Sequence, residues 1–248
     1  RDACPVSWWA QSMPSEDWAK EACWAEGNGF TTMKVKARPW YDIDAQLRAV
    51  SEASSLHFKL DADFNGLLLG VDKAAPLIGR LEDRYERLAI VESPLPQDDV
   101  AGNKLLRQKI RSPISMHFGS PPVMTAIGEG VCDGFVIGGG VKRVLDEGTI
   151  AAQAKMPFWL QMVGTGLTTT FAVHLGAVLK EARWPAIPCI NIYSHTLLKD
   201  FDVKGGHIAV PQAPGLGVEL DWDAVERFRV EDDFKKEPVR QIHEIHWP

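Results

Sequence analysis

The sequence lacks the features that mark several classes of protein. No apolar run approaches the length of about 18 residues that a membrane-spanning helix needs, and no charged-then-apolar leader opens the chain. The four cysteines form no CxxC pair and no regular framework, which argues against a zinc site and against disulfides. We therefore expect a cytoplasmic protein with reduced thiols and no membrane partner.

Clusters of basic residues are also missing. The net charge is -6, with 27 Lys and Arg against 33 Asp and Glu. Nothing in this balance favours a nucleic acid as the partner, so we expect a small molecule. A chain of 248 residues can bury a substantial core, and one main domain is the natural expectation.

What the chain has instead is a regular alternation of short apolar runs and amphipathic segments. The runs are residues 6–10, 32–37, 57–61, 88–91, 114–117, 134–137, 158–163 and 187–192. Helical patterns lie between them, the first opening at Ser15 and the second at Asp42 or Asp44. Strand followed by helix, repeated around a parallel sheet, predicts an α/β fold, a (β/α)8 TIM-type barrel over residues 1–195.

The remainder of the chain, residues 196–248, breaks this alternation. It is rich in Gly and Pro and contains the short β-like run HIAV at residues 207–210. A bare barrel has no place for such a segment. We expect it to leave the barrel and pack elsewhere.

Two lysines lie on one face of the second apolar run. Lys34 and Lys36 alternate with Met33 and Val35, and side chains two apart on a strand lie about 6.6 Å apart on the same face. At an effective dielectric constant of about 20 the two ammonium groups repel each other by about 2.5 kcal/mol, enough to lower the pKa of one. A lysine with a lowered pKa is a potential base. The alternative is an edge strand with a solvated lysine face.

Carboxylates follow at the ends of the next two runs. Asp61 and Asp63 share a face of the third run, and Glu92 directly follows the fourth. Catalytic groups of such barrels lie at the carboxyl ends of the strands, so these side chains are expected at one rim, where oxygen ligands suit a cation such as Mg²⁺. Alternatively, Asp61 caps a helix and Glu92 pairs with Arg84 or Arg87.

Four segments together resemble the enolase superfamily, in its mandelate racemase and muconate lactonizing branch. They are KVK at residues 34–36, LDADFNG at 60–66, VESPLP at 91–96 and GGHIAVPQAPGLGVELD at 205–221. The resemblance implies that a carboxylate substrate loses the proton next to its carboxyl group and that Mg²⁺ stabilises the resulting enediolate. It makes Lys36 the base, Lys34 its pKa-lowering, substrate-orienting neighbour, and Asp61 and Glu92 metal ligands.

The resemblance also implies partners for the barrel. Members of this superfamily carry an N-terminal α+β capping domain over the barrel mouth, and residues 196–248 would return to complete it. We expect that this chain lacks that domain and that the protein forms a homo-oligomer, because relatives commonly do.

Three strand ends depart from the pattern of the superfamily. His117 replaces the expected third carboxylate ligand, and an imidazole suits Mn²⁺ or Zn²⁺ better than Mg²⁺. The sixth run ends in the glycines 138–140 instead of a lysine; they form either a tight turn or a cradle for an anion. The seventh run lacks the histidine of mandelate-type members. Racemisation by two bases therefore loses its obvious second base.

Three functions remain open on the sequence. The first is a metal-dependent lyase or dehydratase acting on a sugar acid, with Lys36 as base and His117 or His195 as acid. The second is a family member that has lost catalysis and keeps a binding or structural role. The third is a Schiff-base lyase in which one of the two lysines is the nucleophile.

Overall fold

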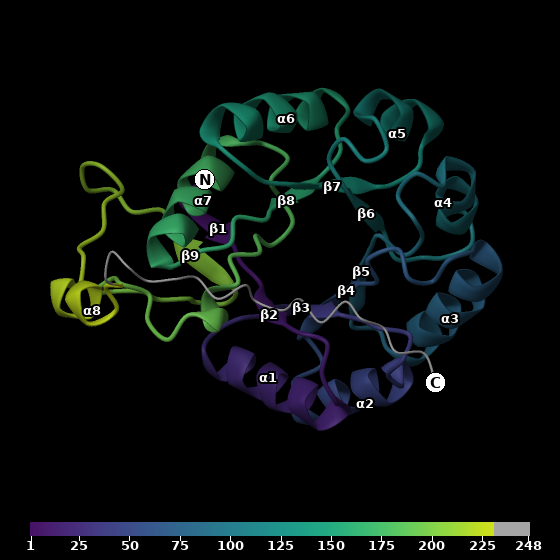
Figure 1. The fold of residues 1–248 in the computed structure, drawn as a ribbon, viewed down its shortest axis with the longest axis horizontal. Coiled ribbons are helices and arrows are strands. Elements are labelled where there is room, and N and C mark those ends of the chain that lie inside the picture. Colours follow the sequence, from purple (N-terminus) through teal and green to yellow (C-terminus); the bar gives the residue numbers. More distant parts are fainter. Residues whose placement is uncertain (231–248) are drawn as a thin grey trace.

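The alternation of the sequence becomes a curled parallel sheet ringed by helices in the computed structural model, which describes residues 1–230 (Figure 1). The seven strands pair in chain order, from β2 to β8. The strands are β2 (Trp8–Ala10), β3 (Thr32–Lys36), β4 (Lys59–Asp63), β5 (Leu88–Glu92), β6 (Ile114–His117), β7 (Gly134–Ile137) and β8 (Phe158–Leu160). The predicted α/β class and the parallel pairing are confirmed.

Helices follow the strands on the outside of the ring. They are α1 (Ser15–Gly27), α2 (Ile43–Ala53), α3 (Val71–Arg84), α4 (Val100–Arg107), α5 (Val123–Glu129), α6 (Val141–Gln153) and α7 (Gly166–Val178). Local chemistry sets several of their ends. The Asp42 carboxylate accepts a hydrogen bond from the amide of Ala45 at 3.0 Å and caps α2. Gly130 ends α5 in the left-handed conformation, with φ of 65°.

The two edges of the curled sheet meet through single bridges instead of an eighth strand. Ala186 pairs with Val6 just before β2, and Ile187 pairs with Gln161 just after β8. Both bridges are parallel. The chain then forms a short 3₁₀-helix, η1 (Ile190–Ile192).

The expected strand over residues 187–192 is therefore reduced to a bridge at its first residue. Pro188 has no backbone N–H to donate to a neighbouring strand. The next residue, Cys189, has φ of 51°, which takes the backbone out of the extended region. The apolar composition of this run indicated a strand, but its backbone cannot continue one.

The strands bury side chains on both faces. The outward side chains form the main core against the helices, whereas the inward ones form a second, smaller cluster inside the ring. This inner cluster consists of Ile90, Val136, Trp159, Ile187 and Cys189. Trp8 and Trp9 show the alternation at β2: Trp8 packs edge-on against Phe30, and Trp9 packs against the inner cluster.

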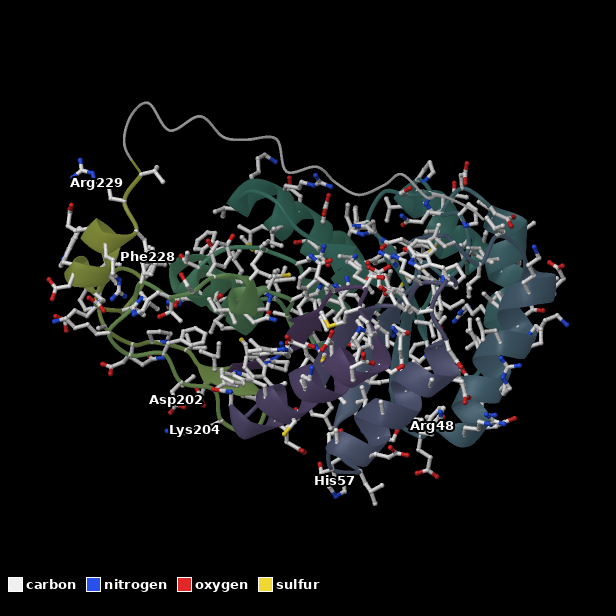
Figure 2. The ribbon with its side chains drawn as sticks, turned by 60° about the horizontal axis from the view of Figure 1, so that its bottom comes forward. Arg48, His57, Asp202, Lys204, Phe228 and Arg229 are labelled. Atoms are coloured by element: carbon white, nitrogen blue, oxygen red, sulfur yellow. The ribbon has the colours of Figure 1, made fainter. Side chains whose placement is uncertain are left out.

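The C-terminal segment turns back to the start of the chain. Strand β9 (His207–Ala209) pairs antiparallel with β1 (Ala3–Pro5), and helix α8 (Trp222–Arg227) follows. Figure 2 shows Phe228 and Arg229, just beyond α8, at the opposite side of the molecule from Arg48 on α2. The rest of the predicted segment 196–248, from residue 231 onward, lies outside the described residues.

Two further expectations concern the cysteines and the membrane. All four thiols are free in the structure, Cys23 being exposed and the other three buried. Within residues 1–230, none of the helices combines the length and the apolar character that crossing a membrane requires.

Candidate active site

The lysine pair faces the inside of the ring. Strand β3 pairs with β2 on one side and with β4 on the other, so it is not an edge strand. The Lys34 side chain is 1% exposed and that of Lys36 is 20% exposed. The interpretation as a solvated edge is therefore wrong, because both side chains point to the carboxylates of the neighbouring strands.

Lys34 lies at the centre of a buried charge cluster. Its Nζ lies 2.5 Å from Oε2 of Glu92 on β5 and 3.4 Å from Oδ2 of Asp63 on β4. It also donates a hydrogen bond of 2.8 Å to Oε1 of Gln161, beyond the end of β8. The ring of Trp159 lies beneath the ammonium group, with its centroid 5.3 Å from Nζ. Three strands and the residue after β8 thus converge on one cation.

The charge cluster determines the direction of the pKa shift of Lys34. Burial alone would lower the pKa of Lys34, but the charges of Glu92 and Asp63 outweigh burial and raise the pKa above its ordinary value. The lowered pKa that the sequence predicts for one lysine of the pair, with Lys36 as the base, therefore does not belong to Lys34. Its ammonium group is a fixed positive charge inside the ring.

Lys36 is the lysine that reaches the opening of the ring. Its Nζ donates to Oδ2 of Asp63 at 2.5 Å and to Oδ1 of Asn65 at 3.3 Å. Burial would raise the pKa of Asp63, but the charges of Lys34 and Lys36 together lower it to about 2. Asp63 is thus a permanent anion that holds the Lys36 side chain in place.

Asp61 is the carboxylate that has the fewest compensating contacts. It is 1% exposed, and its Oδ2 has no hydrogen-bond partner within residues 1–230. Burial raises the pKa of Asp61 to about 7; the Lys34 charge lowers it and the Glu92 charge raises it further. Because Asp61 lies inside the ring, the alternative that it caps a helix is wrong.

Glu92 contacts His117 as well as Lys34. Its Oε1 lies 3.3 Å from Nε2 of His117 at the end of β6. The alternative partners of Glu92 are engaged elsewhere, since Arg84 pairs with Asp44 and Arg87 donates to Ser54. The structure therefore brings together the side chains that the sequence placed at three consecutive strand ends.

The same residues fit a divalent cation in part. Among residues 1–230 no group of three His, Cys, Asp or Glu side chains is arranged to hold a metal ion as it stands. However, Oδ2 of Asp61 is buried without a hydrogen-bond donor among these residues, whereas Glu92 faces Lys34 and His117. Such a buried carboxylate oxygen carries charge that a cation would compensate. Oxygen donors suit Mg²⁺, and the imidazole of His117 suits Mn²⁺ or Zn²⁺, so the ligand set Asp61, Glu92 and His117 stays a prediction.

His195, the other candidate acid, lies with the C-terminal segment. Its Nε2 is 3.6 Å from Oδ2 of Asp221, and its ring stacks on Phe228 with the centroids 6.1 Å apart. Figure 2 shows Phe228 at the edge of the molecule. The chain leaves the ring after η1, which explains why the structure does not bring His195 to the lysines.

Sequence reasoning missed Gln161, the contact of Lys34 from across the ring. The signal was present, because residue 161 shares the inward face with Trp159 by the two-residue alternation of a strand. The superfamily pattern calls for a titratable side chain in the seventh run, and an amide does not titrate. At the first of the glycines 138–140 two backbones approach closely: a Cβ on Gly138 would lie 2.5 Å from the carbonyl oxygen of Gln161, which explains the glycine at this position.

Replacing Asp61 by asparagine is expected to stabilise the metal-free protein above neutral pH. The folded-state pKa of about 7 exceeds the ordinary 3.8, so stability is full at acid pH and declines as the pH rises through this window. A shift of this size corresponds to on the order of 4 kcal/mol as an upper bound. Thermal unfolding at pH 8 with EDTA should show a Tm several degrees above wild type.

Asp63→Asn is the matched control for Asp61→Asn. Its folded pKa of about 2 lies below the ordinary value, so ionised Asp63 contributes stability above about pH 4 that is lost as the pH falls. Asp63→Asn should therefore lower the Tm at pH 8. A lower Tm for both variants would contradict the uncompensated state of Asp61.

Comparisons with known proteins find matches over most of this chain. The Enolase C-terminal domain-like family matches residues 17–224. The chain is 30% identical to an N-succinylamino acid racemase of Amycolatopsis sp over 77% of its length, and 24% identical to an o-succinylbenzoate synthase of Bacillus subtilis (strain 168) over 92%. It spans 53% and 62% of the length of these two relatives.

A solved structure shows the same arrangement of strands and helices. It is the crystal structure of a mandelate racemase/muconate lactonizing family protein from Azoarcus sp. EbN1. The similarity has a TM-score of 0.74 with 27% sequence identity, and it covers 92% of this chain and 65% of that one.

Proposed function

The chain belongs to the Enolase C-terminal domain-like family, and we propose that it abstracts the proton next to the carboxyl group of a small carboxylate with the help of a divalent cation. The observation that carries this proposal is the placement of Lys36. Its ammonium group is partly exposed at the opening and pairs with the buried Asp63, whose carboxylate also contacts Lys34 beside Glu92. A base and a charge-stabilising centre therefore lie side by side.

Lys36 takes the proton in this proposal. A general base must reach the proton that it removes, and the amine of Lys36 is held at the opening by Asp63 and Asn65. Once the ammonium group has lost a proton to solvent at the opening, the neutral amine accepts the proton from carbon, and the electron pair of the broken C–H bond moves toward the carboxyl group. Asp63 then stabilises the ammonium group that forms, because its carboxylate already accepts from the same nitrogen.

The interior of the ring stabilises the negative charge that develops on the substrate. Lys34 provides a fixed positive charge there, and its surroundings exclude water, so the charge acts at a low effective dielectric constant. Asp61, Glu92 and His117 would hold the cation, which when bound supplies Lewis-acid stabilisation of the same charge. Lys34 contacts Glu92 in the structure, so Glu92 would interact with both the ammonium group and the cation.

Elimination fits the site better than racemisation. Among the described residues, the ring positions beyond β7 and β8 carry Gly138, which has no side chain, and Gln161, whose amide accepts no proton. Burial raises the pKa of the nearby Cys189 thiol to about 11, which keeps it protonated. We propose a lyase, specifically a dehydratase of a sugar acid. The α-proton passes to Lys36, the C–O bond at the next carbon breaks, and the hydroxyl leaves as water after His117 protonates it; in this step His117 is the acid, and Asp61 and Glu92 alone would hold the cation.

Deuterium exchange tests this function. The protein is incubated in D₂O with Mg²⁺ and a library of acid sugars, and proton NMR follows the signal at the carbon next to the carboxylate. We expect exchange or dehydration of at least one acid, and its loss on addition of EDTA. The absence of metal-dependent exchange across the library would sink the proposal.

A binding role without catalysis is the second candidate, favoured by the lack of a complete ligand group among residues 1–230. Calorimetry with Mg²⁺, Mn²⁺ and Zn²⁺ discriminates, because binding that Asp61→Ala abolishes argues for a working metal site. The Schiff-base alternative requires a neutral, nucleophilic amine. The raised pKa of Lys34 disfavours it there, and borohydride trapping of an adduct on Lys36 would be needed to support it.

The substrate pocket extends beyond the ring in our proposal. We propose that residues 196–248 form the segment that joins a capping domain over the opening. The observed pairing of β9 with β1 supports part of this, because it anchors the returning segment beside the first residues of the chain.

A further inference from the structure

Gln161 reaches Lys34 from the other side of the ring. In the sheet, β4 to β7 separate β3 from β8, yet Oε1 of Gln161 accepts a 2.8 Å hydrogen bond from Nζ of Lys34. The curl of the sheet brings the two positions together. The contact fixes the direction in which both side chains point.

The partner of Gln161 also fixes which end of its amide faces the opening. A lysine ammonium group has three donors and no acceptor, so the amide oxygen of Gln161 must face Lys34. The NH₂ group then points away from Lys34. Within residues 1–230, Lys34 is the hydrogen-bond partner of this side chain, and Gln161 is partly exposed. Two N–H donors are therefore available to a ligand.

The backbone around Gln161 is held on both sides. The backbone N–H of Gln161 donates to the carbonyl of Ile137 on β7 at 2.8 Å. The backbone N–H of Ile187 donates to the carbonyl of Leu160, the residue before Gln161, at 2.8 Å. Gly138 also lies close to the backbone carbonyl of Gln161 and packs against it. A donor on such a support binds without first being ordered.

We propose that Gln161 is a specificity-determining residue that donates a hydrogen bond to a second oxygen acceptor of the carboxylate substrate. This inference rests on the proposed function, since it assumes a carboxylate beside Lys34 and Lys36. The NH₂ group of Gln161 can only donate hydrogen bonds. It therefore favours a ligand that carries an acceptor, such as a carbonyl or a hydroxyl oxygen. Carboxylates with a purely apolar chain leave this donor unpaired and bind more weakly.

Calorimetry with matched probe pairs tests the inference in the presence of Mg²⁺. N-acetylglycine carries a carbonyl that pentanoate lacks, and glycerate carries hydroxyls that butanoate lacks. We expect the wild-type protein to bind the acceptor-bearing member of at least one pair about tenfold more tightly, as one hydrogen bond implies. The pair that shows the difference identifies the acceptor.

Two variants separate recognition by Gln161 from its contact with Lys34. Gln161→Met loses both the donor and the acceptor, whereas Gln161→Glu keeps an oxygen for Lys34 and loses the N–H groups. We expect the tenfold discrimination to disappear in both variants. Discrimination that persists in Gln161→Glu assigns the residue to positioning of Lys34 and overturns the inference. Equal binding of all four probes by wild type overturns it too.

The failure of this inference is distinguishable from failure of the proposed function. Proton exchange with no discrimination between probes removes the role of Gln161 and leaves the function of Lys36 intact. Discrimination without exchange in any acid removes the catalytic proposal and leaves the recognition role.

Discussion

Replacement of Lys36 by methionine is expected to lower the rate of proton exchange next to the substrate carboxylate by about 10²- to 10⁴-fold, the contribution of a positioned general base. Methionine keeps the length of the side chain and removes the nitrogen. Because the Lys36 side chain is 20% exposed and Asp63 keeps its contact with Lys34, the fold should persist. Proton NMR in D₂O measures the exchange rate, and thermal unfolding confirms the fold.

Lys59→Met is the matched control for Lys36→Met. Lys59 begins β4, at the opposite end of that strand from Asp63, and donates to the carbonyl of Glu86. It should exchange substrate protons at the wild-type rate. An exchange rate of Lys36→Met within threefold of wild type would assign the base to another residue.

Replacement of Lys34 by methionine is expected to have the largest effect on stability. Its ammonium group compensates Glu92 and Asp63, which are buried with it. Removing one partner of a buried charge cluster costs about 3–5 kcal/mol, because the remaining charges stay uncompensated. Urea denaturation at pH 7 should show this loss in the free energy of unfolding.

The pH dependence identifies the cause of the Lys34 effect. The folded-state pKa of Lys34 lies above its ordinary value of 10.5, so its contribution is full below that pH and is lost as the pH rises through the folded-state pKa. The double variant Lys34→Met, Glu92→Gln should recover part of the stability, because it removes one uncompensated anion. A loss below about 1 kcal/mol, or no recovery in the double variant, would show that the cluster does not act as described.

The sequence predicted the strands of the ring because period and burial agreed there. Alternation at residues 32–37 placed Lys34 and Lys36 on one face, and the parallel order of strands placed Asp61 and Glu92 beside them. These positions depend on local patterning and chain order, which are both visible in a single sequence. Two predicted strand ends differ from the observed ones by one or two residues. The predicted strands end at residues 61 and 91, and the observed strands end at residues 63 and 92.

The features that the sequence did not predict depend on contacts between distant segments. The direction of the Lys34 pKa shift follows from two carboxylates whose distances the sequence does not contain. His195 follows a run that looks like a strand but becomes η1, so the direction of the chain beyond that point was not visible. Gln161 contacts Lys34 because the curl of the sheet brings the end of β8 close to β3 across the ring.

A crystal structure with Mg²⁺ and a bound, unreactive carboxylate tests the central claim most directly. The account predicts an ion on the carboxylates of Asp61 and Glu92. It also predicts the Nζ of Lys36 about 3–3.5 Å from the carbon next to the substrate carboxyl group, the distance of a reacting pair. Two results would contradict the account. One is a structure in which Glu92 contacts Lys34 and no ion is bound, and the other is a structure in which that carbon faces away from Lys36.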